Sequence, residues 1–291
     1  MKAAAFAYHR PDTVEEAVHL LGQYGDGAKI LAGGQSLVPM LAMRLTYFEN
    51  LIDISRLDEL RSIDPVDGEV RIGAATPHAF VGMDDEVADS VPLLTLATPY
   101  IGHFQIRTRG TLGGAIAHAD PAAEYAAVAL ALDAQMEAVS PRGRRQIPAT
   151  EFFTGLWQTS LAPDELLTAV RFPIWAGRCG YAVHEFARRH GDFAIAGAAV
   201  AVQIDDDDRV SRCAIGLLGL GSTPRRAAAA EQAVVGTSVD ELAPEEVGER
   251  AMSGLDDIPT DLQGSAAYRS KVGAAMVARA WTQAGTEARN A

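Results

Sequence analysis

Cysteine is scarce in this chain of 291 residues, which contains only Cys179 and Cys213. With no Cys-x-x-Cys pair and no third or fourth thiol, the chain alone can build neither a disulfide framework nor an iron–sulfur cluster. Both cysteines are expected to be reduced residues that pack in the interior. Any iron–sulfur chemistry associated with this protein would therefore have to come from another chain.

Long apolar runs and metal-binding patterns are also missing. No stretch approaches the roughly 18 apolar residues of a membrane-spanning helix, and residues 1–8 lack the apolar segment of a signal peptide. The seven histidines form no His-Glu-x-x-His motif and no pair at ligand spacing beside a carboxylate. The sequence thus predicts a cytoplasmic protein with no membrane insertion and no metal site of its own.

The chain has few basic residues, 25 compared with 38 acidic ones, and its formal net charge is −13. Such a chain is repelled by nucleic acid and by anionic membrane surfaces. An anionic cofactor would be repelled as well, unless local hydrogen-bond donors hold it. Main-chain N–H groups at a bend next to a helix N-terminus are donors of this kind.

Two loops offer such donors. The first glycine loop is Ala-Gly-Gly-Gln-Ser at residues 32–36, and the second glycine loop is Thr-Leu-Gly-Gly-Ala at residues 111–115. A Gly-Gly pair removes both Cβ atoms where a backbone must bend or approach a ligand closely. Each loop precedes a helix-like stretch, so the two are predicted to form the halves of one phosphate site, although either pair alone could mark a plain turn.

Periodicity and turn residues predict an α+β fold in two parts. Thr13 to Glu16 fits a capping box for a helix over 13–24. Further predicted elements in the first part are strands at 29–32, 50–54 and 70–74, helical turns at 37–44, a helix from 76 with Pro77 in its first turn, helices at 91–102 and 121–134, and a hairpin of 135–140 and 144–148.

Pro173, Gly177 and Gly180 punctuate the chain and predict a domain boundary near residue 175. Beyond it, three consecutive strands are expected at 181–187, 198–204 and 210–218, followed by helices at 224–235, 240–254 and 265–286. The aspartates at 205–208 are read as a solvated turn between the last two strands, because the calcium-loop glycine and glutamate are absent.

Two enzyme signatures fail on inspection. The segment Gly219-Leu220-Gly221 follows a strand and precedes a helix, but the third glycine of a dinucleotide fingerprint is missing and its strand belongs to an antiparallel meander. Ser36 lacks the second glycine of a nucleophile elbow, which argues against a hydrolase. No side chain is therefore predicted to act as a catalytic acid, base or nucleophile.

Three motifs in order carry a family resemblance: the first glycine loop, the segment 101–124 around the second one, and Arg-Arg-His-Gly-Asp-Phe-Ala at 188–194. Together they resemble the FAD-binding medium subunit of the molybdenum hydroxylases, the family of carbon monoxide dehydrogenase and xanthine dehydrogenase. The resemblance implies an FAD-binding domain over 1–175, with subdomains of about 1–58 and 59–175. It also implies a C-terminal domain over 176–291 with a three-stranded antiparallel sheet and helices.

The same resemblance implies a set of cofactor contacts and no metal ligand. The pyrophosphate would lie against Ile30, Leu31, Ala32, Gly33, Gly34, Gln35, Ser36 and Leu37 on one side and Thr111, Leu112, Gly113, Gly114 and Ala115 on the other. The remaining expected contacts are Ile101, Asp120, Glu124, Leu167, His184 and Phe193. Structural roles stay open for several of them: Asp120 and Glu124 as helix-end carboxylates, and Ile101 and Phe193 as packing residues.

By resemblance, the chain would collect electrons on FAD from two 2Fe–2S clusters of a small subunit. The clusters would receive these electrons from the molybdenum cofactor of a large subunit, and FAD would pass the electrons to an external acceptor. The expected assembly is a dimer of heterotrimers. Two alternatives remain at this stage: a stand-alone FAD-dependent oxidase with its own substrate pocket, and a non-redox scaffold that has lost the cofactor.

Overall fold

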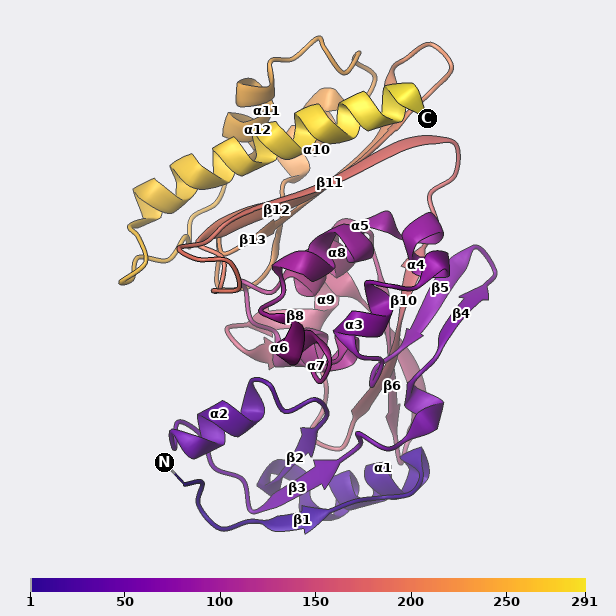
Figure 1. Ribbon diagram of the computed structural model, residues 1–291, viewed down its shortest axis with the longest axis vertical. Coiled ribbons are helices and arrows are strands. Elements are labelled where there is room, and N and C mark those ends of the chain that lie inside the picture. Colours follow the sequence, from indigo (N-terminus) through magenta and orange to yellow (C-terminus); the bar gives the residue numbers. More distant parts are fainter. Residues whose placement is uncertain (1) are drawn as a thin grey trace.

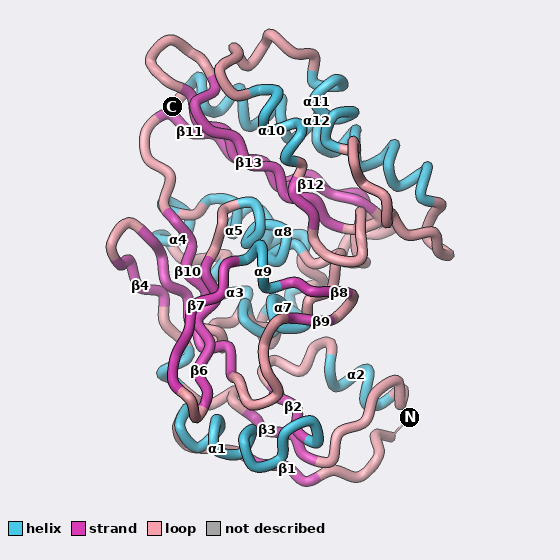
Figure 2. The backbone as a smooth tube through the Cα atoms, turned by 180° about the vertical axis from the view of Figure 1, so that it is seen from behind, coloured by secondary structure: helices cyan, strands magenta, loops and turns pink. Residues whose placement is uncertain are grey.

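A computed structural model describes residues 2–291, in which three larger sheets are stacked along the long axis of the molecule and a fourth sheet is a two-stranded hairpin (Figure 1). The N-terminal sheet lies at one end, a five-stranded sheet with its helices lies in the middle, and the sheet of the C-terminal residues lies at the other end. Figure 2 shows the same order from behind, with helix α1 beside the first sheet and helix α12 above the last. This mixed arrangement confirms the predicted α+β class.

The N-terminal sheet is parallel, in the order β1-β3-β2. Helix α1 begins after Thr13, whose hydroxyl accepts a hydrogen bond from the Glu16 N–H at 3.1 Å, as the capping motif predicts. Its buried face packs with Ile52 and Leu57 in a small separate core. The elements are β1 (Ala7–His9), α1 (Val14–Tyr24), a 3-10 turn (Gly25–Gly27), β2 (Ala28–Leu31), α2 (Leu37–Ala42), β3 (Asn50–Asp53) and a 3-10 turn (Asp58–Leu60).

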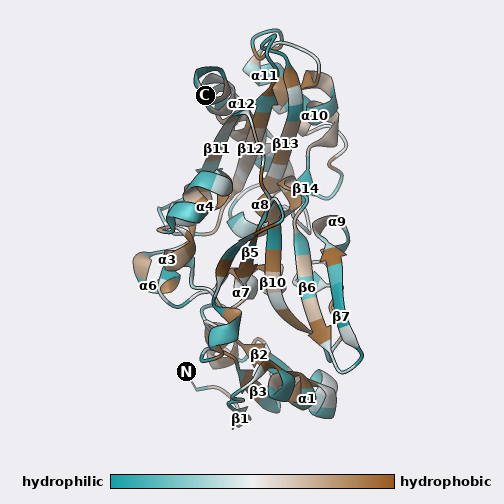
Figure 3. Cartoon of the chain, turned by 90° about the vertical axis from the view of Figure 1, so that its right-hand side faces the viewer, coloured by the Kyte–Doolittle hydropathy of each residue, from teal (hydrophilic) through white to brown (hydrophobic). Residues whose placement is uncertain are grey.

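The middle sheet is antiparallel, in the order β4-β5-β10-β6-β7. Its strands are β4 (Ile63–Val66), β5 (Glu69–Gly73), β6 (Gln135–Ser140), β7 (Gly143–Pro148) and β10 (Leu166–Pro173), and a small hairpin adds β8 (Phe153–Gly155) and β9 (Gln158–Thr159). Strands β6 and β7 pair antiparallel, from Ser140 opposite Gly143 next to the turn to Gln135 opposite Pro148, which confirms the predicted hairpin. Figure 3 colours β7 largely as hydrophilic, as expected for an edge strand.

Short helices cover this sheet and differ from the predicted ones in length. They are α3 (His78–Val81), α4 (Asp85–Ser90), α5 (Pro92–Ala97), a 3-10 turn (Thr98–Tyr100), α6 (Phe104–Arg107), α7 (Leu112–His118), α8 (Glu124–Ala131) and α9 (Ala149–Phe152). Pro77 is the cap of α3 and lies outside its first turn, so the predicted start of that helix is wrong by one residue. The Thr76 N–H instead donates a hydrogen bond to the Gly73 carbonyl, and the Thr76 carbonyl accepts one from the Leu112 N–H.

The C-terminal sheet is antiparallel, in the order β11-β12-β13-β14. The predicted three strands are present as β11 (Arg178–Phe186), β12 (Ala196–Ile204) and β13 (Val210–Leu218), and β14 (Arg225–Arg226) adds a short fourth strand. The helix predicted at 224–235 is therefore wrong at its start, because Arg225 and Arg226 pair with β13. The helices are α10 (Ala228–Val234), α11 (Pro244–Ala251) and α12 (Ala266–Asn290).

The two faces of the C-terminal sheet contact different parts of the molecule. Ala182 on β11 belongs to the core formed with α12, whereas Tyr181 and Val183 belong to the large core shared with the middle sheet. Because side chains alternate along a strand, every even-numbered residue of β11 from 180 to 186 faces α12 and every odd-numbered one faces the middle of the molecule. Both cysteines are buried and free, as predicted.

Candidate cofactor site

The two glycine loops lie against each other, although 79 residues separate Gly34 from Gly113 in the chain. The first joins β2 to α2, and the second leads into α7. A Cβ atom on Gly33 would lie 2.1 Å from the carbonyl oxygen of Arg109, and one on Gly114 would lie 3.6 Å from the Cβ of Ala32. The missing side chains therefore let the two backbones meet, as the sequence predicts.

The first glycine loop leaves its donors free. None of the main-chain N–H groups of residues 32–36 donates a hydrogen bond to another residue within 2–291. Gly34 has a φ of +72°, a left-handed conformation that glycine adopts without strain. The Gln35 side chain folds back and donates to the Gly33 carbonyl at 2.9 Å. A half-buried run of five unpaired donors is a suitable environment for an anion.

The second glycine loop uses its donors inside the protein. The N–H groups of Leu112 and Gly113 donate to the carbonyls of Thr76 and Ala74 at 3.0 and 2.9 Å. The Gly114 N–H donates to the Thr111 hydroxyl at 3.1 Å, which caps α7. The backbone of residues 111–115 is therefore part of the fold, and these residues lie opposite the first loop. Their contact with the cofactor stays a prediction.

His78 supports the second loop from behind. The main-chain N–H of His78 donates a hydrogen bond to the Gly110 carbonyl at 2.9 Å. The His78 ring packs against Gly110, so that a Cβ on this glycine would lie 2.7 Å from Cδ2 of the ring. The imidazole is 4 % exposed and its Nδ1 makes no hydrogen bond within residues 2–291. Burial, with a smaller contribution from the Arg107 charge, lowers the pKa of His78 to about 4. No motif in the sequence signals this residue, because its role depends on long-range packing.

Polar residues line the chain just after α7. Asp120 accepts a hydrogen bond from the Ala122 N–H at 2.9 Å and one from the indole N–H of Trp157 at 3.3 Å. That indole stacks on the His118 ring, with centroids 6.3 Å apart. Asp120 therefore has the structural role that the sequence left open, as a turn-forming carboxylate. The same carboxylate fixes the position of the Trp157 side chain, which is 53 % exposed. No motif in the sequence marks Trp157.

Glu124 is the first residue of helix α8 and is partly buried. Burial raises its pKa well above the usual range of a carboxyl, its own N–H acts in the opposite direction, and the Asp120 charge raises it further. A first-turn carboxylate on the surface would not be desolvated in this way. The role as a first-turn carboxylate, which the sequence leaves open, agrees with its position in α8.

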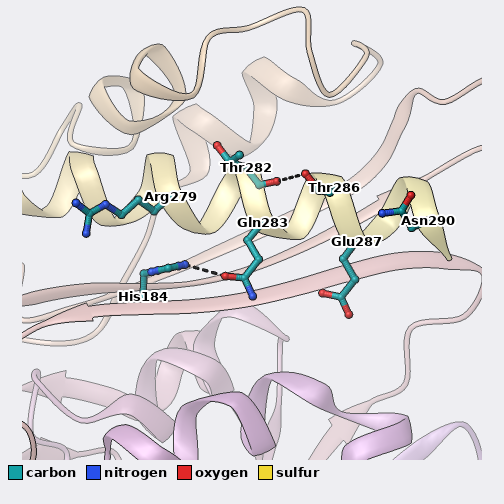
Figure 4. Close-up of a pocket in the computed structure, with 7 residues that line it drawn as sticks. All are labelled: His184, Arg279, Thr282, Gln283, Thr286, Glu287 and Asn290. Atoms are coloured by element: carbon teal, nitrogen blue, oxygen red, sulfur yellow. Dashed lines mark hydrogen bonds between the residues drawn. The ribbon is translucent and has the colours of Figure 1, made fainter.

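His184 and Leu167 lie away from the other expected contacts. His184 faces α12, and its Nε2 lies 2.9 Å from Oε1 of Gln283 in a polar surface pocket shown in Figure 4. Leu167 is 4 % exposed in the core of the middle sheet. On the opposite face of β11, the residue that approaches Glu124 is Glu185, whose pKa is raised by burial and by the Glu124 charge. His184 thus lies on the α12 side of β11, and its contact with the cofactor stays a prediction.

Phe193 and Ile101 differ in their exposure to solvent. Phe193 is 63 % exposed, which excludes core packing as its reason for being aromatic. Its neighbour Gly191 lies against His103, so the 188–194 segment contacts the chain that leads into the second loop. Ile101 is partly buried against the large core, and its carbonyl accepts a hydrogen bond from Arg107 at 3.1 Å. Arg107 is thereby a structural residue.

Two further predictions are settled by topology. The strand before Gly219 is β13, which pairs antiparallel with both of its neighbours, so the parallel unit of a dinucleotide fold is absent there. The aspartates at 205–208 form the turn between β12 and β13. Within residues 2–291, no group of three or more His, Cys, Asp or Glu side chains is arranged to hold a metal ion. No helix in this part of the chain is long and apolar enough to cross a membrane.

Comparison with known proteins identifies the class. Residues 4–175 match the family described as FAD binding domain in molybdopterin dehydrogenase, and residues 181–284 match the CO dehydrogenase flavoprotein C-terminal domain. The chain belongs to the family of FAD-binding medium subunits of the molybdenum hydroxylases, and it is an oxidoreductase subunit.

Particular relatives are similar over nearly their whole length. Subunit alpha of the 6-hydroxypseudooxynicotine dehydrogenase complex from Paenarthrobacter nicotinovorans is 42 % identical over 98 % of this chain and 96 % of its own. The carbon monoxide dehydrogenase medium chain of Hydrogenophaga pseudoflava is 37 % identical over 94 % of this chain and 95 % of its own. A solved structure of the Hydrogenophaga dehydrogenase superposes with a TM-score of 0.95, at 38 % identity and 99 % coverage of both chains.

Proposed function

We propose that this chain is the FAD-binding subunit of a heteromeric molybdenum hydroxylase, from which electrons pass to an external acceptor. The observation that supports it most directly is the run of unpaired N–H groups at residues 32–36, held against the second glycine loop. An FAD pyrophosphate carries negative charge into a protein of net charge −13. Five main-chain donors can hold that charge without any arginine or lysine, and such donors need no reorganisation on binding.

The residues present fit this cofactor. Residues 32–36 would bind the pyrophosphate, with the Ser36 hydroxyl free to add a bond because it does not cap α2. Gly114 lies opposite Ala32, since a Cβ on Gly114 would be 3.6 Å from the Cβ of Ala32. Phe193 offers an exposed aromatic face, and Ile101 an apolar edge, for a flavin ring.

Bound FAD would supply the redox chemistry, and the chain would bind, orient and shield it. The electrons would come from the molybdenum cofactor of a large subunit through two 2Fe–2S clusters of a small subunit, and leave to an external acceptor. The relatives named as subunits and medium chains of dehydrogenase complexes support these partners. We further propose a dimer of heterotrimers, and a division of this chain into an FAD-binding domain over 1–175 and a C-terminal domain over 176–291.

Purification of the native complex under non-denaturing conditions tests this function. We expect a yellow-brown preparation that contains FAD, molybdenum and iron, with two partner subunits in equal amounts. Recombinant chain alone should bind added FAD but oxidise no substrate. An active homomer of this chain would overturn the proposal in favour of a stand-alone oxidase, and a chain that cannot be loaded with FAD would favour a scaffold.

A further inference from the structure

An exposed tryptophan lies one helical turn from the place where the two glycine loops meet. Gly114 and His118 are four residues apart on α7, so they share one face of this helix. At Gly114 that face is turned toward the first loop, since a Cβ there would lie 3.6 Å from the Cβ of Ala32. The Cα–Cβ bonds of a helix tilt toward its N-terminus, so the His118 side chain leans toward the loops. The Trp157 indole stacks on the His118 ring with 15° between their planes and therefore lies beside the proposed pyrophosphate site.

The small hairpin of β8 and β9 holds Trp157 in this position. Strand β9 packs against α7, and Figure 2 shows the hairpin beside that helix. The indole N–H donates to Oδ2 of Asp120, two residues beyond His118, at 3.3 Å. The hydrogen bond and the stack orient the indole from the α7 side, while more than half of the residue stays exposed. An aromatic ring that is oriented and yet exposed is able to stack on a planar ligand.

Nothing in the fold of this hairpin requires a tryptophan at position 157. Gly155 pairs with Gln158, so Leu156 and Trp157 form a two-residue turn. Trp157 has a φ of +55°, a left-handed conformation that favours glycine or asparagine and is unusual for a bulky residue. Its exposure also leaves much of its apolar surface in water, where it adds little to stability. Residues held in such conformations cluster at binding sites, where contacts with a ligand are the reason for keeping them.

We propose that Trp157 is a further residue of the cofactor site and that its free face stacks on the adenine ring of bound FAD. The adenosine of FAD is joined directly to the pyrophosphate, and base rings stack favourably on aromatic side chains. The flavin ring is assigned to Phe193, whose segment contacts His103 ahead of the second loop, whereas Trp157 lies at the far end of α7. This inference rests on the proposed FAD-binding function and assigns the adenine half of the cofactor.

The test is the FAD affinity of the cofactor-free chain with Trp157→Asn, measured by calorimetric titration. Asparagine tolerates a left-handed φ, so the variant should unfold at the temperature of the wild type or slightly above it. Its FAD affinity should fall roughly 5- to 100-fold, the loss expected for one stack of an aromatic side chain on a base. Leu156→Ala, at the neighbouring exposed position of the same turn, is the matched control and should bind FAD as the wild type does. Unchanged affinity in Trp157→Asn, or an equal loss in Leu156→Ala, would overturn the proposal.

A second arm uses ADP, which carries the adenine and two phosphates but no flavin. Trp157 is the exposed one of three tryptophans, since Trp175 and Trp281 are 7 % and 1 % exposed, so acrylamide quenching of the fluorescence reports chiefly on it. ADP should protect this emission from acrylamide, whereas inorganic pyrophosphate should not. A wild-type chain that binds FAD but gains no protection from ADP would keep the proposed function and overturn the stack. A chain that binds no FAD would overturn the proposed function, and protection by ADP would then still support a purine site at Trp157.

Discussion

The two glycine loops look alike in sequence but differ in how their backbones are used. The first loop keeps the N–H groups of residues 32–36 unpaired, whereas the N–H groups of Leu112 to Ala115 in the second all donate within the protein. The second is largely buried and backed by His78, and the first is half exposed. A Gly-Gly pair can therefore free donors for a ligand or allow close packing, and only the surrounding contacts decide which.

Substitution at Gly113 should have the largest effect, because it tests whether the second loop is part of the fold. A Cβ there would lie 2.3 Å from the Cβ of Ala74. We expect Gly113→Val to lower the free energy of unfolding by about 4 kcal/mol, or to prevent folding, with or without FAD. Chemical denaturation of the cofactor-free protein measures it. An unchanged midpoint would mean that the second loop can move freely.

Acid should destabilise the support of the second loop. The unfolded chain protonates His78 near pH 6.5, whereas the buried ring resists protonation until about pH 4. Stability is therefore complete above pH 6.5 and falls by up to about 3 kcal/mol as the pH drops toward 4. Comparison of acid unfolding of the wild type with His78→Phe, which cannot titrate, isolates this contribution. Equal acid sensitivity in both proteins would contradict the role given to His78.

Substitution at Gly33 should separate binding from folding. Its added Cβ would meet the Arg109 carbonyl and push the first loop away from the second. We expect Gly33→Ala to weaken FAD binding by about 2 kcal/mol, a factor of roughly 30, and to cost less stability than Gly113→Val because the first loop is half exposed. Fluorescence titration with FAD, alongside thermal unfolding, measures both. Full FAD affinity in this variant would show that the contact between the loops is dispensable.

The two hydroxyls at the ends of the loops provide the finest comparison. The Thr111 hydroxyl caps α7, so Thr111→Ala should cost about 1 kcal/mol of stability in the cofactor-free protein. The Ser36 hydroxyl caps nothing, so Ser36→Ala should leave stability unchanged and weaken FAD binding by about 0.5–1.5 kcal/mol. The reverse pattern would exchange the roles of the two loops.

Local signals predict much of this fold. The capping box before α1, the hairpin of β6 and β7 and the three long strands of the C-terminal sheet all follow from turn residues and periodicity. The pattern predicts no strand at Leu166–Pro173, yet β10 is the central strand of the middle sheet. Residues 166–170 are buried throughout, so the alternation that marks a half-exposed strand is missing.

The candidate site is predictable only in part. Sequence alone identifies both glycine loops, because glycine pairs are local features, whereas the role of Glu124 at the cofactor is implied by the family resemblance and stays a prediction. It cannot tell which face of β11 is turned to α12, so the contact of His184 with Gln283 is not predictable from the sequence. Likewise, His78 and Trp157 contribute through contacts with residues far away in the chain.

Amide hydrogen exchange of the two loops, with and without FAD, tests the central claim most directly. In the cofactor-free protein, the amides of residues 32–36 should exchange fast and those of 112–115 slowly, because only the latter are hydrogen-bonded. FAD should slow exchange in the first loop by at least about tenfold and leave the second nearly unchanged. Equal protection of both loops before FAD is added, or no change at residues 32–36 on saturation with FAD, would contradict the account.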